Sequence, residues 1–197
     1  MISLITNPKN NDLSTQVATL EQILRLNQTA WRLLEIAEKT IKYPWFMGGG
    51  GIYHTVWNYY SKRPIESDLK DYDIFYFNEN HNEVEHSIFE HTLNEGRDNE
   101  MIDLTNVATV HIWLKEVLNK IVSPYNSIEE DIDSFGNTIA SIGVRLRGKE
   151  LQVYAPYGLR DIFSLEVHHV GGIFTQDEYL KKAKSWQKRW PEILIHN

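Results

Sequence analysis

The sequence predicts an α+β fold, in which a mixed β-sheet is flanked by helices and followed by a small C-terminal α/β extension. Segments with helical and with strand periodicity are interleaved, and no internal repeat or low-complexity linker separates them. The length of 197 residues fits one domain. We therefore expect a single domain over 1–197, with N-terminal helices at 14–42, a core at 43–122 and the C-terminal extension at 123–197.

The chain should open with two helices, over 14–26 and 28–42. Apolar side chains recur at helical spacing in both, and Asn27 between them has the side chain of a helix N-cap. Pro44 limits the second helix. The apolar run that follows, 45–47, has the length of a buried strand and leads into four glycines.

The clearest strand signal in the chain is the run 72–77, in which aromatic and β-branched side chains dominate. A helix should come before it, starting at Ile52 and ending ahead of Pro64. After it we expect a helix over 82–94, a short strand over 101–105 and a helix over 107–121.

In the C-terminal part, two capping-box patterns mark helix starts. Residues 127–135 carry one of them and should form a short helix, and 175–190 carry the other and should form the last helix. Between these helices, the runs 140–146 and 150–154 are expected to pair as strands through the glycine turn at 147–149.

Composition excludes several classes of function. The chain has no cysteine, which rules out disulfides, thiolate nucleophiles and cysteine-ligated metal centres. No run approaches the roughly 18 apolar residues of a membrane span. The polar N-terminus lacks the features of a signal peptide, so we expect a cytoplasmic protein that does not contact a membrane. The formal net charge of −7 disfavours a long nucleic acid as partner.

The main candidate for chemistry is the run Asp71-Tyr72-Asp73. Residues i and i+2 of a strand project from the same face, so Asp71 and Asp73 present two carboxylates side by side. Tyr72 and Ile74 then face the packing. Two like charges this close repel each other and raise one pKa unless a cation lies between them. A hard divalent ion such as Mg²⁺ relieves that repulsion and prefers oxygen ligands.

Asp103 is the candidate for a third carboxylate. It stands alone between Ile102 and Leu104, and an acid in such a position is costly unless it is paired or bound to metal. If its strand lies beside that of Asp73, the three acids come together. Three carboxylates can hold two metal ions about 4 Å apart, the arrangement used for in-line phosphoryl displacement.

The glycine run supplies a complementary anion site. It consists of Gly48, Gly49, Gly50 and Gly51. Glycines between a strand and a helix let the backbone approach a ligand and expose its N–H groups, and the next helix directs its positive end to the same place. We expect a triphosphate cradle opposite a metal platform. Lys70 and Arg145 are further candidates for phosphate contacts.

Met47 with the glycines, a helix and then Asp71-Tyr72-Asp73-Ile74 resemble the signature of the DNA polymerase β-like nucleotidyltransferase superfamily. In that signature a hydrophobic residue and a small-residue pair precede a D-h-D strand, where h is hydrophobic. From Leu20 onward the chain is similar to a family of bacterial predicted nucleotidyltransferases. The further motifs of this resemblance are Trp57-Asn58, Asn106 with Val110-His111-Ile112-Trp113, Gly143-Val144-Arg145-Leu146, Ala155-Pro156-Tyr157-Gly158-Leu159, and Trp186 with Trp190-Pro191.

The resemblance implies a nucleotidyltransferase-like fold and transfer of a nucleoside monophosphate from an NTP. The ligands that it implies for Mg²⁺ (or Mn²⁺) are Asp71, Asp73 and Asp103. It also implies that Gly49, with Gly50 or Gly51, meets the phosphates. The gap 52–70 before the first aspartate is longer than is usual in the superfamily, which leaves the choice of glycines open. No acceptor is implied, and the acidic balance favours a small molecule over a long nucleic acid.

Other polar patterns have plainer explanations. Asp131 and Asp133 form a second D-x-D, but i and i+2 do not share a face of a helix, so we expect a solvated acidic helix. His81, His86 and His91 recur every five residues, which does not align metal ligands on one helix face, so exposed positions are expected. The lysines of the last helix should lie in water, with nucleotide binding as the alternative.

Three hypotheses follow from these patterns. The first is an active, metal-dependent nucleotidyltransferase. The second is a nucleotide-binding or regulatory protein on the same fold without turnover, because fold alone does not separate the two. The third is a globular protein in which the acids form only surface ion pairs. The presence of all three acids favours the first, while the nucleobase and the oligomeric state are not indicated.

Overall fold

The computed structural model describes residues 5–95 and 102–197 of the chain. Five strands of this part form one sheet: β1 (Trp45–Gly48), β2 (Tyr72–Tyr76), β3 (Ile102–Asn106), β4 (Gly143–Arg147) and β5 (Glu150–Tyr154). Their order across the sheet is β3-β2-β1-β4-β5. β2 and β3 run parallel, whereas the other neighbours are antiparallel. The sheet is therefore mixed, which confirms the predicted fold class.

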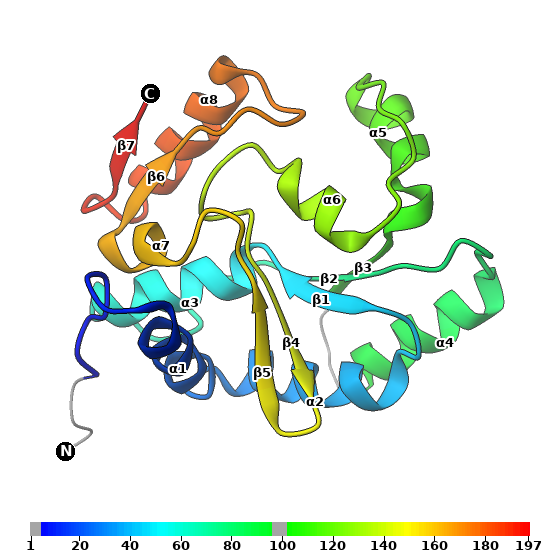
Figure 1. Cartoon of the computed structure of the whole chain (residues 1–197), viewed down its shortest axis with the longest axis horizontal. Helices are drawn as coiled ribbons and strands as arrows, with labels where there is room; N and C mark the ends of the chain where they lie inside the picture. The colour runs from blue at the N-terminus through cyan, green and yellow to red at the C-terminus, as the bar shows by residue number, and fades with distance from the viewer. Residues whose placement is uncertain (1–4, 96–101) are drawn as a thin grey trace.

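Four helices pack with each other and with this sheet. They are α1 (Leu13–Leu24), α2 (Gln28–Thr40), α3 (Gly50–Tyr60) and α4 (Glu83–Asn94). Contacts join α1 to α3, α2 to α4, and α3 to both β1 and β2. In Figure 1, α1, α2 and α4 lie below β1 and β2. Trp57, Tyr72 and Tyr76 are almost completely buried in the core that these elements share, and burial of such large apolar surfaces is the main source of stability.

Asn27 joins the first helices to the sheet. Its side-chain oxygen accepts a hydrogen bond from the Ala30 N–H at 2.9 Å, so it caps α2 as predicted. The same oxygen accepts from the Tyr72 hydroxyl at 3.1 Å, and the amide donates to Thr55 Oγ1 at 2.8 Å. Because its hydrogen bonds are satisfied, this polar side chain can be fully buried. It therefore helps to fix α3 against β2.

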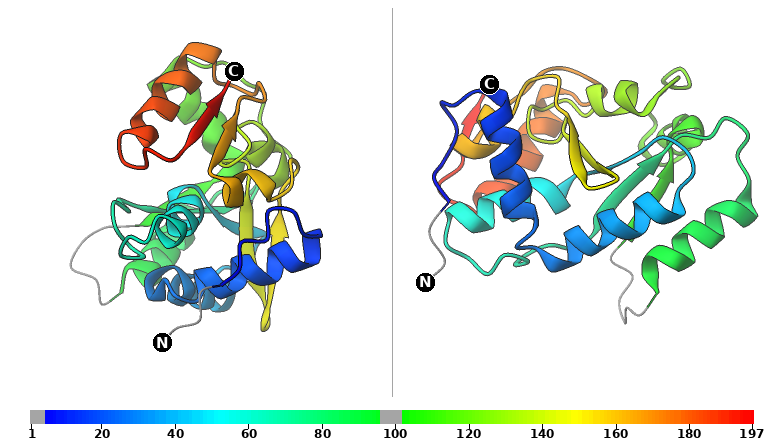
Figure 2. Two further views of the ribbon diagram at one scale, coloured as in Figure 1. Left: turned by 90° about the vertical axis from the view of Figure 1, so that its left-hand side faces the viewer. Right: turned by 60° about the horizontal axis from the view of Figure 1, so that its bottom comes forward.

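Three helices lie on the other side of β1 and β2 (Figures 1 and 2): α5 (Val110–Leu118), α6 (Ile128–Asp133) and α8 (Gln176–Gln187). A 3-10 turn, η1 (Val107–Thr109), leads into α5, where the sequence predicted one helix over 107–121. α5 ends early because Asn119 adopts the left-handed conformation, with φ of 53°.

The C-terminal part contains elements that the sequence pattern did not predict. They are α7 (Arg160–Ser164) and two parallel strands, β6 (Glu166–His168) and β7 (Leu194–His196). The Tyr179 hydroxyl of α8 lies 2.7 Å from the carbonyl oxygens of both Val167 and His196 and so joins the two strands. With 3 residues each, these strands are too short for alternation to reveal them.

The predicted capping boxes differ in outcome. Thr175 and Glu178 form the full reciprocal pair at the start of α8. At α6 only half of the box forms: Ser127 Oγ accepts from the Glu130 N–H at 3.2 Å, but the Glu130 carboxylate accepts from the Asn126 N–H instead. The helix start is nevertheless the expected one.

Strand boundaries differ by a few residues from those predicted. β4 begins at Gly143 rather than at residue 140, and Met101 of the strand expected over 101–105 lies outside the described residues. In the described part of the chain, every helix falls short of the length and apolar character needed to cross a membrane.

Candidate active site

The glycine run forms a tight turn over β2. Gly49 lies between the end of β1 and the start of α3, and its φ of 61° and ψ of −150° form a combination that is essentially restricted to glycine. A Cβ atom at Gly49 would overlap the Asp73 carboxylate, and one at Gly51 would meet the Tyr72 ring at 2.7 Å. The lack of side chains therefore allows the start of α3 to lie directly against β2.

The structure brings Asp71, Asp73 and Asp103 together across two neighbouring strands. β2 and β3 are parallel, and their register sets Asp73 directly beside Asp103. Asp71 immediately precedes β2 and shares the face of Asp73. Tyr72 and Ile74 are buried on the opposite face, as the alternation predicted. The three acids thus lie at one edge of the sheet, where α3 begins.

The three carboxylates repel one another. Burial is the largest cause that raises the pKa of Asp73 to about 7, and the charges of Asp71 and Asp103 add to it. Burial and the charge of Asp71 also raise the pKa of Asp103. A hydrogen bond from the Gly50 backbone and the positive charge of Lys182 act in the opposite direction on Asp73. Acids held together against such repulsion favour a cation between them.

This donor set fits a hard divalent cation, because it offers only carboxylate oxygens. Its side chains are more widely spread than those of a closed site. Among the described residues, the group of three donors that all lie within 4.8 Å of one another is Glu166, His168 and His196. An ion shared by the aspartates therefore requires their side chains to turn toward each other. Asp71, which is exposed and precedes the strand, can do so.

The group on β6 and β7 suits a polar network better than a metal ion. The rings of His168 and His196 are stacked, with centroids 4.1 Å and planes 6° apart. The nitrogen lone pairs of the two rings therefore lie in two nearly parallel planes and do not converge on one ion. Asp161 approaches His168 Nδ1 at 2.8 Å, and Glu166 approaches His196 Nε2 at 3.3 Å. The stacked rings and the Glu166 contact therefore join β6 to β7, and the Asp161 contact joins α7 to β6.

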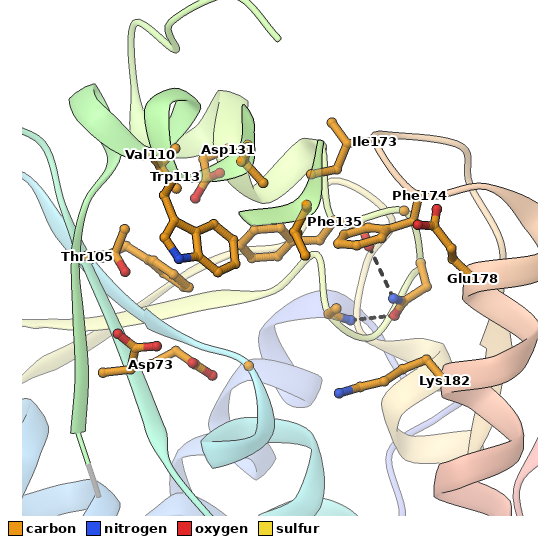
Figure 3. A pocket seen from close by; sticks show the side chains of 18 of the residues that line it. Asp73, Thr105, Val110, Trp113, Asp131, Phe135, Ile173, Phe174, Glu178 and Lys182 are labelled. Atoms are coloured by element: carbon orange, nitrogen blue, oxygen red, sulfur yellow. Dashed lines mark hydrogen bonds between the residues drawn. The ribbon is translucent and has the colours of Figure 1, made fainter. Parts of the chain in front are cut away.

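A cavity of about 1040 Å³ lies next to the aspartates. Gly49, Asp73 and Asp103 line one side of it. The wall formed by α5, α6 and the residues just after α6 carries the rings of Trp113 and Phe135 (Figure 3). A cavity of this size accommodates a nucleotide together with part of a second substrate, since small-molecule sites span about 300–1,000 Å³.

Two lysines of α8, Lys181 and Lys182, also line the cavity. Both are exposed to solvent, as the sequence predicted for the lysines of this helix, and they also lie at the cavity. Lys182 lies close enough to lower the pKa of Asp73, and Figure 3 shows its side chain extending from α8 toward the side of the cavity where Asp73 lies. A sequence signal was present, because Lys182 precedes the buried Trp186 by one helical turn.

The predicted phosphate contacts Lys70 and Arg145 lie apart from this cavity, in that neither is among the residues that line it. Arg145 on β4 donates through Nε to Gln152 at 2.9 Å and lies over the Phe46 ring at 4.8 Å. Lys70 is an exposed residue of the loop before β2. The lysines that line the cavity are instead Lys181 and Lys182 of α8.

Asp131 is a cavity residue, and the expectation that it would be solvated was wrong. The short helix forms as predicted, and Asp133 is exposed and accepts a hydrogen bond from the Tyr154 hydroxyl at 2.8 Å. Asp131, however, is only 3% exposed, and burial raises its pKa to about 7. The reason is that Ile128 and Ile132 are fully buried on the same side of α6 and draw Asp131 inward.

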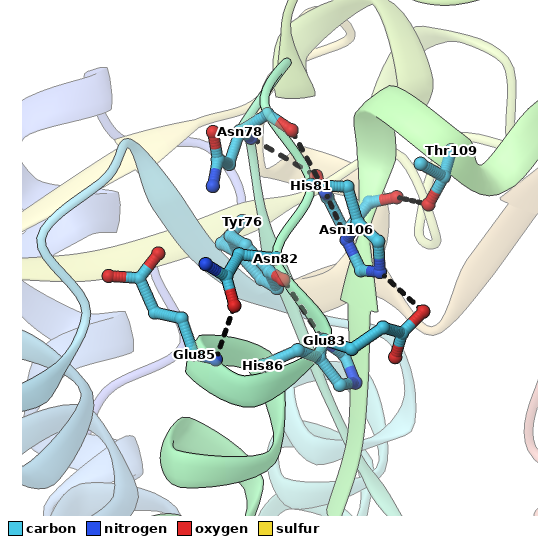
Figure 4. A network of polar contacts seen from close by, with 9 residues as sticks. All are labelled: Tyr76, Asn78, His81, Asn82, Glu83, Glu85, His86, Asn106 and Thr109. Carbon is cyan, nitrogen blue, oxygen red and sulfur yellow. Dashed lines mark hydrogen bonds and ion pairs between the residues drawn. The ribbon is translucent and has the colours of Figure 1, made fainter.

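A polar network follows the ends of β2 and β3 (Figure 4). Asn106 accepts from the Asn78 N–H at 3.1 Å, donates to the Asn78 carbonyl at 2.9 Å and lies 3.0 Å from His81 Nδ1. His86 Nδ1 lies 2.9 Å from the Tyr76 hydroxyl. His81 and His86 are thus half-buried and hold the chain that follows β2, rather than standing exposed as predicted.

Residues 36–195 match the family described as Nucleotidyltransferase, and this range contains the glycine run, the three aspartates and the lining of the cavity. An NMR structure described as revealing a CCA-adding enzyme head domain has the same fold. It matches with a TM-score of 0.71 over 91% of this chain and 95% of that chain, at 18% sequence identity. No curated protein matches the sequence. The chain belongs to the nucleotidyltransferase family.

Proposed function

We propose that this nucleotidyltransferase moves a nucleoside monophosphate from an NTP to a small-molecule acceptor, with Mg²⁺ or Mn²⁺ held by Asp71, Asp73 and Asp103. The observation that carries the proposal is the register that sets Asp73 beside Asp103 while the start of α3 lies against Asp73. Family membership supports nucleotidyl transfer in general. The net charge of −7 favours a small acceptor over a long nucleic acid.

A divalent ion bound by the aspartates would supply positive charge to the oxygens around the transferred phosphorus. The chain contributes positioning. The N-terminal N–H groups and dipole of α3 favour a phosphate group, and Lys182 offers a point charge from the other side of the cavity. Asp73 and Asp103 are held on paired strands, so their separation is set by the sheet. Catalysis of this kind rests on positioning and electrostatics.

Label transfer tests the proposal. Wild type, Asp73→Asn and Asp103→Asn are incubated with α-labelled NTPs and a cell extract, and labelled acceptors are counted. Each variant should lose about 100-fold or more of the transfer, the scale of losing one preorganised electrostatic contact. Asp133→Asn is the matched control, because this acid is exposed and belongs to the other D-x-D. Label transfer that persists in the double variant Asp71→Ala/Asp73→Ala would contradict the mechanism.

The same protein samples can also reveal the alternative function, that of a nucleotide-binding protein without turnover. Calorimetry would then show binding of the magnesium NTP complex by wild type and weaker binding by Asp73→Asn. No label would reach an acceptor with either protein.

A further inference from the structure

The cavity wall across from the aspartates has chemistry that phosphate binding does not use. α5 places Trp113 on this wall, α6 places Asp131 there, and Phe135 follows the end of α6 (Figure 3). The indole of Trp113 lines the cavity and is nevertheless 51% exposed. The ring of Phe135 packs against that of Phe75, which also lines the cavity, with ring centroids 5.5 Å apart. Partly exposed aromatic rings in a concave site are typical of a stacking surface.

Asp131 is the buried polar group of the same wall. Its backbone carbonyl accepts hydrogen bonds from Ser134. Its carboxyl group has no hydrogen-bond partner anywhere in the ranges 5–95 and 102–197, although the residue is only 3% exposed. A buried carboxyl group without donors costs free energy, and a ligand that brings N–H groups recovers it.

The ligand that matches this wall has hydrogen-bond donors at the edge of an aromatic ring. Phosphate oxygens are negatively charged acceptors, so Asp131 repels the triphosphate and leaves the base as its partner. Guanine presents two adjacent donors, N1–H and the 2-amino group, which fit the two oxygens of one carboxylate. Hypoxanthine lacks the amino group, and uracil has a single N–H between two acceptors.

We propose that Trp113 and Phe135 stack the nucleobase of the donor NTP and that Asp131 selects guanine. The inference rests on the proposed function, because it takes the triphosphate to lie between α3 and Lys182. The two ends of the nucleotide then contact opposite sides of one cavity, with the phosphates at the aspartates and the base at α5 and α6.

Calorimetric titration with the magnesium complexes of GTP, ITP and UTP tests the proposal. ITP differs from GTP only in the missing 2-amino group. We expect wild type to bind GTP about 10- to 100-fold more tightly than ITP, and Asp131→Asn to bind the two equally. Trp113→Ala should weaken all three by a similar factor of about 10, because stacking tolerates any base. Asp133→Asn, on the exposed side of α6, should change none of the affinities.

The outcomes separate this inference from the function on which it rests. Equal affinity of wild type for GTP and ITP overturns guanine selection and leaves nucleotidyl transfer standing. If wild type binds none of the three nucleotides, both fail. Asp131→Asn should unfold at least at the temperature of wild type, since the amide has the same shape without a buried charge, so its loss of selectivity is distinguishable from a loss of fold.

Discussion

Replacement of Gly49 by alanine should damage both the fold and the site, whereas the same change at Gly148 should affect the fold alone. Both glycines have positive φ, 61° and 64°, so alanine meets backbone strain of about 1–2 kcal/mol or more at either position, and Gly49, with ψ of −150°, lies in a region that essentially only glycine adopts. Their surroundings differ. A Cβ atom at Gly148 has nothing within 4 Å, whereas one at Gly49 overlaps the Asp73 carboxylate. Comparison of the two variants therefore measures that contact together with the strain particular to the Gly49 backbone.

The backbone cannot relieve the overlap, because β1 and β2 are paired in register and Gly48 lies opposite Asp73. The Asp73 side chain must instead turn away from α3 and lose its hydrogen bond from Gly50, which is worth about 1 kcal/mol. We expect Gly148→Ala to lose about 1 kcal/mol, or roughly 2–4 °C in Tm for a chain of this length. Gly49→Ala should lose about 3 kcal/mol, or roughly 6–12 °C.

Thermal unfolding and label transfer from an NTP, measured on both variants, check these values. Gly148→Ala should transfer label as wild type does. Gly49→Ala should lose about 100-fold of the transfer, since a displacement of about 1 Å in a reacting site can cost that much. Equal shifts in Tm and equal transfer by the two variants would refute the reasoning that Gly49 is required by the position of Asp73.

Changes of charge at three positions should have separable effects. Burial raises the pKa of Asp131 from 3.8 to about 7 in the folded state, so its ionisation destabilises the fold as pH rises through that interval, by up to about 4 kcal/mol. The substitution Asp131→Asn should therefore raise the Tm more at pH 8 than at pH 5. An increase in Tm that does not depend on pH would contradict the burial argument. Mg²⁺ should raise the Tm of wild type but not of Asp73→Asn, and an equal rise in both would place the ion elsewhere. Lys182→Met should weaken NTP binding, measured by calorimetry, about two- to fivefold. Lys184→Met, on the same helix but outside the cavity lining, should leave NTP binding unchanged. Equal losses of affinity in both variants would argue against a phosphate contact by Lys182.

The elements that carry the aspartates could be predicted because their signals are local. Aromatic and β-branched residues mark β2, and a strand, four glycines and a helix in sequence mark the turn that covers it. The proximity of Asp103 to Asp73 could be stated only as a condition. It depends on the pairing of β2 with β3, which are joined through α4, and that pairing is decided by tertiary packing.

Residues contributed by distant helices could not be assigned in this way. Lys182 differs from Lys184 in sequence by its spacing of one helical turn from Trp186, and the docking of α8 through that tryptophan determines which lysine reaches the cavity. Arg145 had the right residue type on a predicted strand, but Gln152 on the neighbouring strand and the Phe46 ring occupy its guanidinium group.

The burial of Asp131 could not be predicted from the pattern of acidic residues alone. Ile128, Asp131 and Ile132 follow the i, i+3, i+4 spacing of one helix face, so the sequence held a signal that this acid lies on the apolar side of α6. Against it stood the cost of burying a carboxyl group, which favours a solvated helix. The packing of both isoleucines with Phe46 and Val107 outweighs that cost. An asparagine of the same shape would stabilise the fold better above pH 7, so stability does not account for the carboxyl group at this position, whereas the proposed contact with guanine does.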